Sequence, residues 1–147
     1  MVHIQTFTFN PLQENTYVLY DDNGVCLIID PGCYDAYEKR TLDEFITTNK
    51  LHVQALLNTH CHIDHVLGNA YVKNKYAVSL YIHPQEEAVL NAVKVYAPHY
   101  GIFQYEEAAA DKYLKENEVL HFGDIALAVL FVPGHSPGHV AFYNAAG

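Results

Sequence analysis

The run His60-Cys61-His62-Ile63-Asp64-His65 places three histidines and an aspartate within six residues. An apolar, strand-like segment at 53–57 precedes the run, and a segment at 65–76 with apolar residues at helical spacing follows it. The run therefore lies at a strand-to-helix junction, and open α/β sheets place their binding sites at the carboxyl ends of strands. These six residues predict both the class of the fold and the position of its site.

The residue types in this run are those of a metal site. Residues two apart in an extended segment point to the same side, so His60 and His62 can bind one metal ion. The backbone must bend after His62, and we expect Asp64 at a helix N-cap with His65 in the first turn, aimed at a neighbouring point. Imidazole and carboxylate ligands suit zinc, with iron or manganese as alternatives. Satisfied surface or core histidines are the competing interpretation, although so many clustered imidazoles are hard to satisfy without a metal ion.

Two further loops carry candidate site residues. His135 follows a long apolar segment and lies in Pro133-Gly134-His135-Ser136-Pro137-Gly138, where prolines and glycines restrict the backbone path. Asp30 ends the apolar segment at 25–29, so we expect it at the same edge of the sheet, where a carboxylate can orient a ligand histidine. The alternatives are a plain turn histidine and a turn aspartate before proline.

The pattern around these loops predicts strands first, then alternating helices and strands, then strands again. This order favours an α/β layered domain with a mixed sheet. No linker or internal repeat interrupts it, so we expect residues 1–147 to form one domain, with an irregular, tyrosine-rich segment at 98–115. The expected strands are 3–9, 16–20, 25–29, 53–57, 79–82, 118–122, 125–132 and one starting at 139, and the expected helices are 35–49, 65–76 and 84–96.

The composition restricts the partners of the chain. It has 8 Lys and Arg against 17 Asp and Glu, a net charge of -9, which argues against a nucleic-acid partner. No apolar run approaches the ~18 residues of a membrane span, and the first residues do not resemble a secretory signal. Three cysteines are too few for a disulfide framework and indicate a reducing cytoplasm, with a mature secreted protein as the alternative. We therefore expect a small-molecule substrate and no membrane partner.

Besides the runs at 60–65 and 133–138, the chain carries Asn10-Pro11-Leu12, Glu14-Asn15-Thr16-Tyr17 and Asp30-Pro31-Gly32. With these motifs it resembles the metallo-β-lactamase-fold hydrolase superfamily, and the glyoxalase II-like branch in particular. The resemblance spans nearly the whole chain. It implies an αββα sandwich with metal ions at one edge, between the sheets.

The resemblance also implies a set of metal ligands. These are His60, His62 and His135 for a first metal ion and Asp64 and His65 for a second, with Asp30 close to both. The family normally continues to a Gly-Asp segment, whose aspartate bridges the metal ions, and then to a last histidine ligand. The chain reaches Gly147 before either, and His139 does not match these roles. We therefore expect a C-terminally truncated member with an incomplete second sheet, and exposed edge strands that favour self-association.

The activity that the resemblance implies is hydrolysis of a thioester, such as an acylated glutathione, by metal-activated hydroxide. Asp64 would orient the nucleophile, and a thiolate leaves readily enough that no strong general acid is required. One alternative is a mononuclear iron dioxygenase that uses His60, His62 and His135. Others are hydrolysis of lactones, β-lactams or phosphodiesters, and a non-catalytic metal-binding module.

Overall fold

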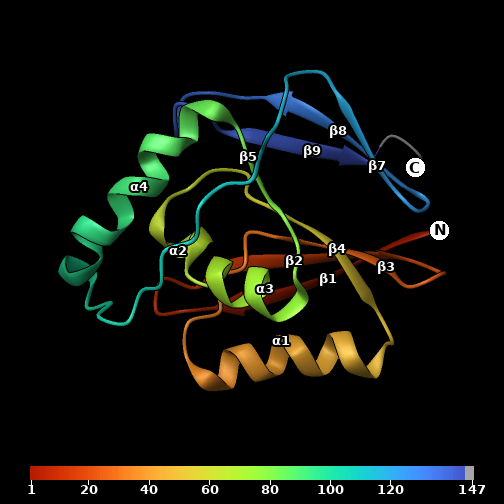
Figure 1. Ribbon diagram of the computed structural model, residues 1–147, viewed down its shortest axis with the longest axis horizontal. Coiled ribbons are helices and arrows are strands. Elements are labelled where there is room, and N and C mark those ends of the chain that lie inside the picture. Colours follow the sequence, from red (N-terminus) through yellow and green to blue (C-terminus); the bar gives the residue numbers. More distant parts are fainter. Residues whose placement is uncertain (145–147) are drawn as a thin grey trace.

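Two packed β-sheets form the centre of the structure, a computed structural model that describes residues 1–144 (Figure 1). In the first sheet β1 to β3 are antiparallel and β3 to β6 are parallel. Its strands, in spatial order, are β1 (Val2–Phe9), β2 (Glu14–Asp21), β3 (Val25–Ile29), β4 (His52–Leu57), β5 (Leu80–Ile82) and β6 (Lys112–Tyr113). The second, antiparallel sheet consists of β7 (Val119–Phe122), β8 (Ile125–Phe131) and β9 (Val140–Asn144).

Short helices connect the strands of the first sheet. They are α1 (Ala36–Thr48), α2 (Ile63–Val66), α3 (Asn69–Tyr76) and α4 (Glu87–Tyr96), with 3-10 turns η1 (Pro84–Glu86) and η2 (Ala97–Tyr100) on either side of α4. Among residues 1–144, no helix combines the length and the apolar character needed to cross a bilayer.

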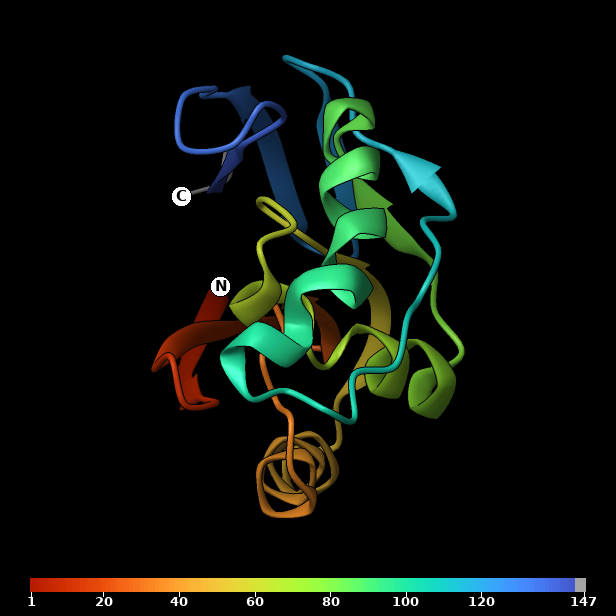
Figure 2. The ribbon, with the colours of Figure 1, turned by 90° about the vertical axis from the view of Figure 1, so that its left-hand side faces the viewer.

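The alternation of side chains along the central strands produces the layers. In β3, Ile28 lies in a core cluster with Leu42 of α1 and Val93 of α4. Its neighbour Leu27 points to the opposite face and packs with Ile125 of β8. Figures 1 and 2 accordingly show α1 and the second sheet on opposite sides of the first sheet. The expected two-sheet α/β sandwich with a mixed sheet is confirmed.

Two local predictions around the histidine run are wrong. The expected helix at 65–76 is divided into α2 and α3 at Gly68. Gly68 lies against the loop after β3: its N–H donates to the Pro31 carbonyl at 2.7 Å, and a Cβ there would lie 2.4 Å from Cys33 Sγ. The helix N-cap is His62 rather than Asp64, so the Asp64 carboxylate lies in the first turn of α2, not at the cap.

The irregular segment at 98–115 contains one strand that the sequence pattern did not predict. This strand, β6, has two residues and pairs in parallel with β5. Both of its residues, Lys112 and Tyr113, are exposed, so no apolar alternation marks the strand. The sheet edge, rather than local preference, positions this segment.

Candidate metal centre

The histidine run begins where β4 leaves the first sheet, and polar contacts anchor the start of the loop. The Asn58 N–H donates to the carbonyl of Tyr81 in the neighbouring strand at 3.1 Å. The side-chain amides of Asn58 and Asn69 exchange two hydrogen bonds, of 3.1 and 2.9 Å. Since both amides are buried, this pair holds the start of α3 against the end of β4. These hydrogen bonds fix the position of the backbone just before His60.

Three imidazoles from two distant loops meet beside this point. His60, His62 and His135 each offer a ring nitrogen, and these three atoms lie within 4.8 Å of one another. His62 Nδ1 and His135 Nε2 are 3.2 Å apart. His60 is buried, His62 is partly buried and His135 is exposed, so the cluster runs from the protein interior to its surface. The structure thus brings together the three histidines predicted for a first metal ion.

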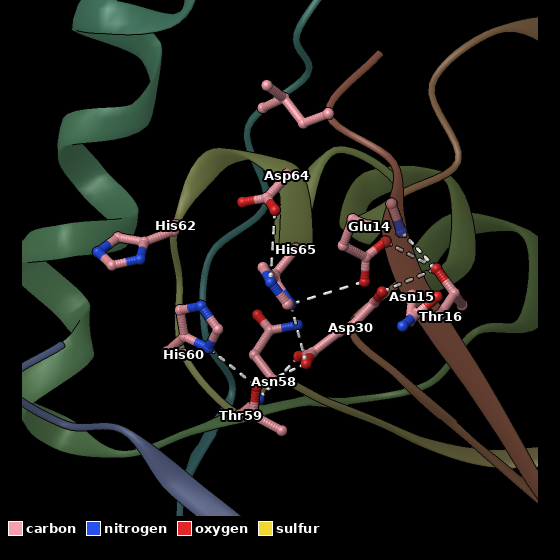
Figure 3. A network of polar contacts seen from close by, with 12 residues as sticks. Glu14, Asn15, Thr16, Asp30, Asn58, Thr59, His60, His62, Asp64 and His65 are labelled. Atoms are coloured by element: carbon pink, nitrogen blue, oxygen red, sulfur yellow. Dashed lines mark hydrogen bonds and ion pairs between the residues drawn. The ribbon is translucent and has the colours of Figure 1, made fainter. Parts of the chain in front are cut away.

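A second group of candidate ligands shares His60 and adds Asp30 and His65, again with ligand atoms within 4.8 Å of one another. Figure 3 shows His65 between Asp64 on one side and Glu14 and Asp30 on the other. His65 Nε2 lies 3.5 Å from Asp64 Oδ2, and His65 Nδ1 lies 3.1 Å from Asp30 Oδ2. Asp64 is therefore adjacent to His65, as expected, but its carboxylate lies outside both compact groups.

Thr59 connects Asp30 to His60 and determines which nitrogen of His60 is available. The Thr59 hydroxyl donates to Asp30 Oδ2 and lies 3.0 Å from His60 Nδ1. Since the hydroxyl proton goes to Asp30, its oxygen accepts from His60 Nδ1–H. His60 Nε2 then carries the free lone pair, and this buried atom has no hydrogen-bond partner among the described residues. A buried acceptor without a partner is energetically costly, and a metal ion would satisfy it.

Burial keeps the innermost histidines neutral. It lowers the pKa of His60 from 6.5 to about 3, and the neighbouring histidines act in the same direction. Burial, followed by His135, also lowers the pKa of His62. For His65 burial opposes the charged form, but the hydrogen bond and charge of Asp30, together with Asp64, raise its pKa overall. Neutral imidazole is the form that binds a metal ion, so His60 and His62 are prepared for this role near neutral pH.

Asp30 has an unusual backbone that aims its side chain into the cluster. Its φ is 54°, in the left-handed region that aspartate tolerates better than most residues. The Asp30 carboxylate accepts the Thr59 N–H at 2.7 Å in addition to the Thr59 hydroxyl and the contact with His65. These buried contacts hold the Asp30 carboxylate in place against Thr59 and His65.

Three residues around the cluster had no role in the sequence-based site. The ring of His139 lies 4.4 Å from that of His60, measured between centroids, which its spacing of four from His135 could have suggested. Glu14 and Glu86 are buried carboxylates, with 4% and 1% of their surface exposed. Nothing in their local sequence marks them as buried, because surface helices and strands also carry glutamates.

Glu14 provides a test of the electrostatics at this site. Burial, and then the charge of Asp30, raises the pKa of Glu14 from 4.5 to about 10. A raised folded-state pKa stabilises the fold fully below about pH 4.5, and this contribution is lost as the pH rises towards 10. Glutamine has no proton to lose. The metal-free Glu14→Gln variant should therefore gain stability relative to the unmodified protein as the pH rises from about 5 to about 9.

The measurement is the free energy of unfolding in urea of the metal-free proteins across that pH range. Glu106→Gln, at an exposed glutamate, is the matched control and should show little such trend. If the difference between Glu14→Gln and the unmodified protein is independent of pH, Glu14 does not hold the proton assigned to it.

The histidines open into a cleft of about 870 Å³. Four of the candidate site residues line it, namely His62, Asp64, His65 and His135. Small, apolar and aromatic residues of α4 and η2 also line it, namely Ala88, Val89, Ala92, Tyr96 and Tyr100. No lysine or arginine lines the cleft formed by the described part of the chain. The lining of the cleft therefore combines the polar candidate site residues with largely apolar side chains of α4.

Together, the two sheets and the histidine cluster at their common edge define a layered α/β fold with a candidate metal centre. The family model for the metallo-beta-lactamase superfamily matches residues 9–147. The chain belongs to this superfamily, whose members are metal-dependent hydrolases. The sequence resemblance is thereby confirmed.

Similar proteins agree with this assignment. The chain is 33% identical to the "Probable metallo-hydrolase YqgX" of Bacillus subtilis over 136 residues, which cover 90% of the chain and 61% of that protein. It is 35% identical to a hydroxyacylglutathione hydrolase of Francisella tularensis, covering 92% of the chain and 44% of that protein. The crystal structure of TTHA1623 in a di-iron-bound form superimposes with a TM-score of 0.78 at 34% identity, covering 95% of the chain and 66% of that structure. The chain thus spans roughly half to two thirds of the length of these proteins.

Proposed function

We propose that this chain carries the metal centre of a hydrolase that acts on small thioesters, similar to hydroxyacylglutathione hydrolases. The observation that carries the proposal is the convergence of His60, His62 and His135 at the edge of the cleft, with their ligand atoms within 4.8 Å of one another. The similarity to hydroxyacylglutathione hydrolases supports the thioester class.

The donor set fits a divalent metal ion. His60, His62 and His135 would hold the first ion, and the buried, unpartnered Nε2 of His60 is what such a site requires. Asp64 and His65 would hold a second ion beside Asp30. Zinc suits these ligands, and iron, as in the di-iron form of TTHA1623, or manganese is the alternative. When bound, such an ion polarises a substrate carbonyl and makes water more acidic.

The residues of the chain orient the reactants in this proposal. Asp64 lies at the cleft and 3.5 Å from His65, where its carboxylate can orient a water molecule and take its proton. Asp30 accepts from His65 Nδ1–H, which leaves His65 Nε2 free towards Asp64 and the cleft. The apolar wall along α4 would receive the organic part of the substrate and exclude water from it. The leaving thiolate is stable enough to depart without a strong acid.

We propose a cytoplasmic protein with a small-molecule substrate and neither a nucleic-acid nor a membrane partner. Its three cysteines are free and buried, which suits a reducing compartment. Its net charge of -9 repels nucleic acids. Self-association through exposed strand edges is part of the same proposal.

The test measures metal content and thioesterase activity of the same preparation. We expect at least one equivalent of zinc, iron or manganese by plasma mass spectrometry. Release of free thiol from an acylated glutathione should depend on that metal and stop when a chelator removes it. A chain that binds none of these metals would overturn the proposal of a metal centre. A metal-loaded chain that releases no thiol would overturn the thioesterase assignment.

A further inference from the structure

Glu86 lies outside both groups of candidate ligands but contacts both loops that carry them. It precedes α4, and only 1% of its surface is exposed. Its Oε1 accepts the N–H of Cys61, between His60 and His62, at 2.6 Å. Its Oε2 accepts the N–H of Gly138, three residues after His135, at 2.8 Å. One buried carboxylate therefore connects the loop after β4 to the loop after β8.

The hydroxyl of Ser136 completes this arrangement. Ser136 Oγ lies 2.8 Å from Glu86 Oε1 and 2.7 Å from Oε2, so its proton is shared between the two oxygens. Every contact of the carboxylate is thus with a donor, as a carboxylate requires. Gly138 has no room for a side chain, because a Cβ there would lie 2.9 Å from Glu86 Cγ. The second loop is closely fitted to Glu86.

The two loops share few other hydrogen bonds. The Val140 N–H donates to the Thr59 carbonyl at 2.8 Å, just outside the histidines. The rings of His62 and His135 meet edge to face, with His62 Nδ1 3.2 Å from His135 Nε2, and the ring of His60 contacts those of His135 and His139. Glu86 therefore supplies most of the hydrogen bonds that hold the loops in register at the level of the ligands.

We propose that Glu86 is a positioning residue that holds the two histidine-bearing loops together, so that His60, His62 and His135 are already aligned before a metal ion binds. This inference rests on the metal centre proposed above. It adds that the alignment of the first metal site depends on a carboxylate that does not touch the metal ion.

Glutamine at position 86 tests the role of the two oxygens with little change in size. Its single oxygen can accept from the Cys61 N–H or from the Gly138 N–H, and its NH₂ group then faces the other N–H. One loop is released in either orientation. We expect the affinity of the metal-free protein for Co²⁺ to fall about 10- to 100-fold. The visible absorption spectrum of the bound Co²⁺ should change as well, because the ligand geometry is altered.

Glu87→Gln is the matched control. Glu87 is the next residue, is exposed and accepts from the Tyr113 hydroxyl instead of a histidine loop. This variant should keep the Co²⁺ affinity and spectrum of the unmodified protein. Urea unfolding of each metal-free variant will separate loss of alignment from loss of the fold.

Amide hydrogen exchange of the metal-free, full 147-residue protein tests the contact independently of any metal ion. In Glu86→Gln, the amide of Cys61 or that of Gly138 should exchange at least tenfold faster, while core amides remain protected. Ser136→Ala removes one donor without changing a charge and should weaken Co²⁺ binding by a smaller factor. It also provides the test if Glu86→Gln does not fold.

The inference is overturned if Glu86→Gln keeps the affinity and spectrum of the unmodified protein, or if neither amide exchanges faster. It is also overturned if Glu86→Gln does not fold and Ser136→Ala binds Co²⁺ normally. If the unmodified chain binds no Co²⁺, the proposed metal centre fails. Faster exchange of one amide in Glu86→Gln would then still support the contact between the loops.

Discussion

Replacing His60 with alanine is expected to abolish metal binding at the first candidate position, which His60 shares with His62 and His135. Among the described residues, His60 is the one shared by the His60–His62–His135 group and the Asp30–His60–His65 group. Its removal leaves the first position with two histidine ligands and takes the buried imidazole away from Asp30 and His65. The thioesterase rate should fall about a thousandfold or more, because metal assistance is worth several kcal/mol and each ~1.4 kcal/mol is a factor of ten.

The measurements are metal content per chain and the rate of thiol release. His52→Ala is the control, because this exposed histidine begins the same strand, β4, and lies at the end of the strand away from the site. His65→Ala removes a proposed ligand of the second ion only and should have a smaller effect on binding at the first position. A His60→Ala protein with unchanged metal content would show that the buried histidine is not a ligand.

The second large effect is expected at Asp30, which is 2% exposed. Alanine there would leave the Thr59 N–H, the Thr59 hydroxyl and His65 Nδ1–H without their acceptor. Each buried donor without a partner costs about 1–3 kcal/mol. Alanine also tolerates the left-handed backbone less well than aspartate. We expect the free energy of unfolding of metal-free Asp30→Ala to fall by at least about 2 kcal/mol.

The Asp30→Asn variant separates orientation from stability. Asparagine tolerates the left-handed backbone and keeps one oxygen that can accept from the Thr59 N–H. Its NH₂ group cannot accept hydrogen bonds from the Thr59 hydroxyl or from His65 Nδ1–H. We expect Asp30→Asn to remain folded while its metal affinity falls about 10- to 100-fold. Urea unfolding and competition with a chelator measure the two effects. Asp22→Asn, at an exposed aspartate paired with His3, is the control. Unchanged metal affinity in Asp30→Asn would contradict an orienting role.

The helices and strands near the site show which structural features the local sequence pattern can predict. The apolar residues of β3 and β4 predicted buried strands, because only a strand covered on both faces is apolar at successive positions. The same kind of pattern failed at 65–76. The division at Gly68 depends on how closely Pro31 and Cys33 approach, and these belong to a loop more than thirty residues away. The periodicity of residues 65–76 carries no information about how closely that loop approaches.

The residues of the site also fall into those that local sequence suggests and those that depend on distant segments. His60, His62 and His65 could be proposed as candidates from sequence because residue types that bind metal ions are concentrated in one short run. The burial of Glu14 and Glu86 could not, because it depends on which loops surround these carboxylates. The approach of His139 to His60 likewise depends on the pairing of β8 with β9, which turns the second loop back over the first.

The sequence by itself determined the layered α/β class, the candidate donor atoms and the loops that present them, because side-chain chemistry and apolar alternation are local properties. The tertiary structure decided which donors meet. It brought His62 and His135, 73 residues apart, to a separation of 3.2 Å. It also placed Glu86 between their loops and left His60 Nε2 without a partner among the described residues. These are relations between distant segments, and they exist only once the two sheets have packed together.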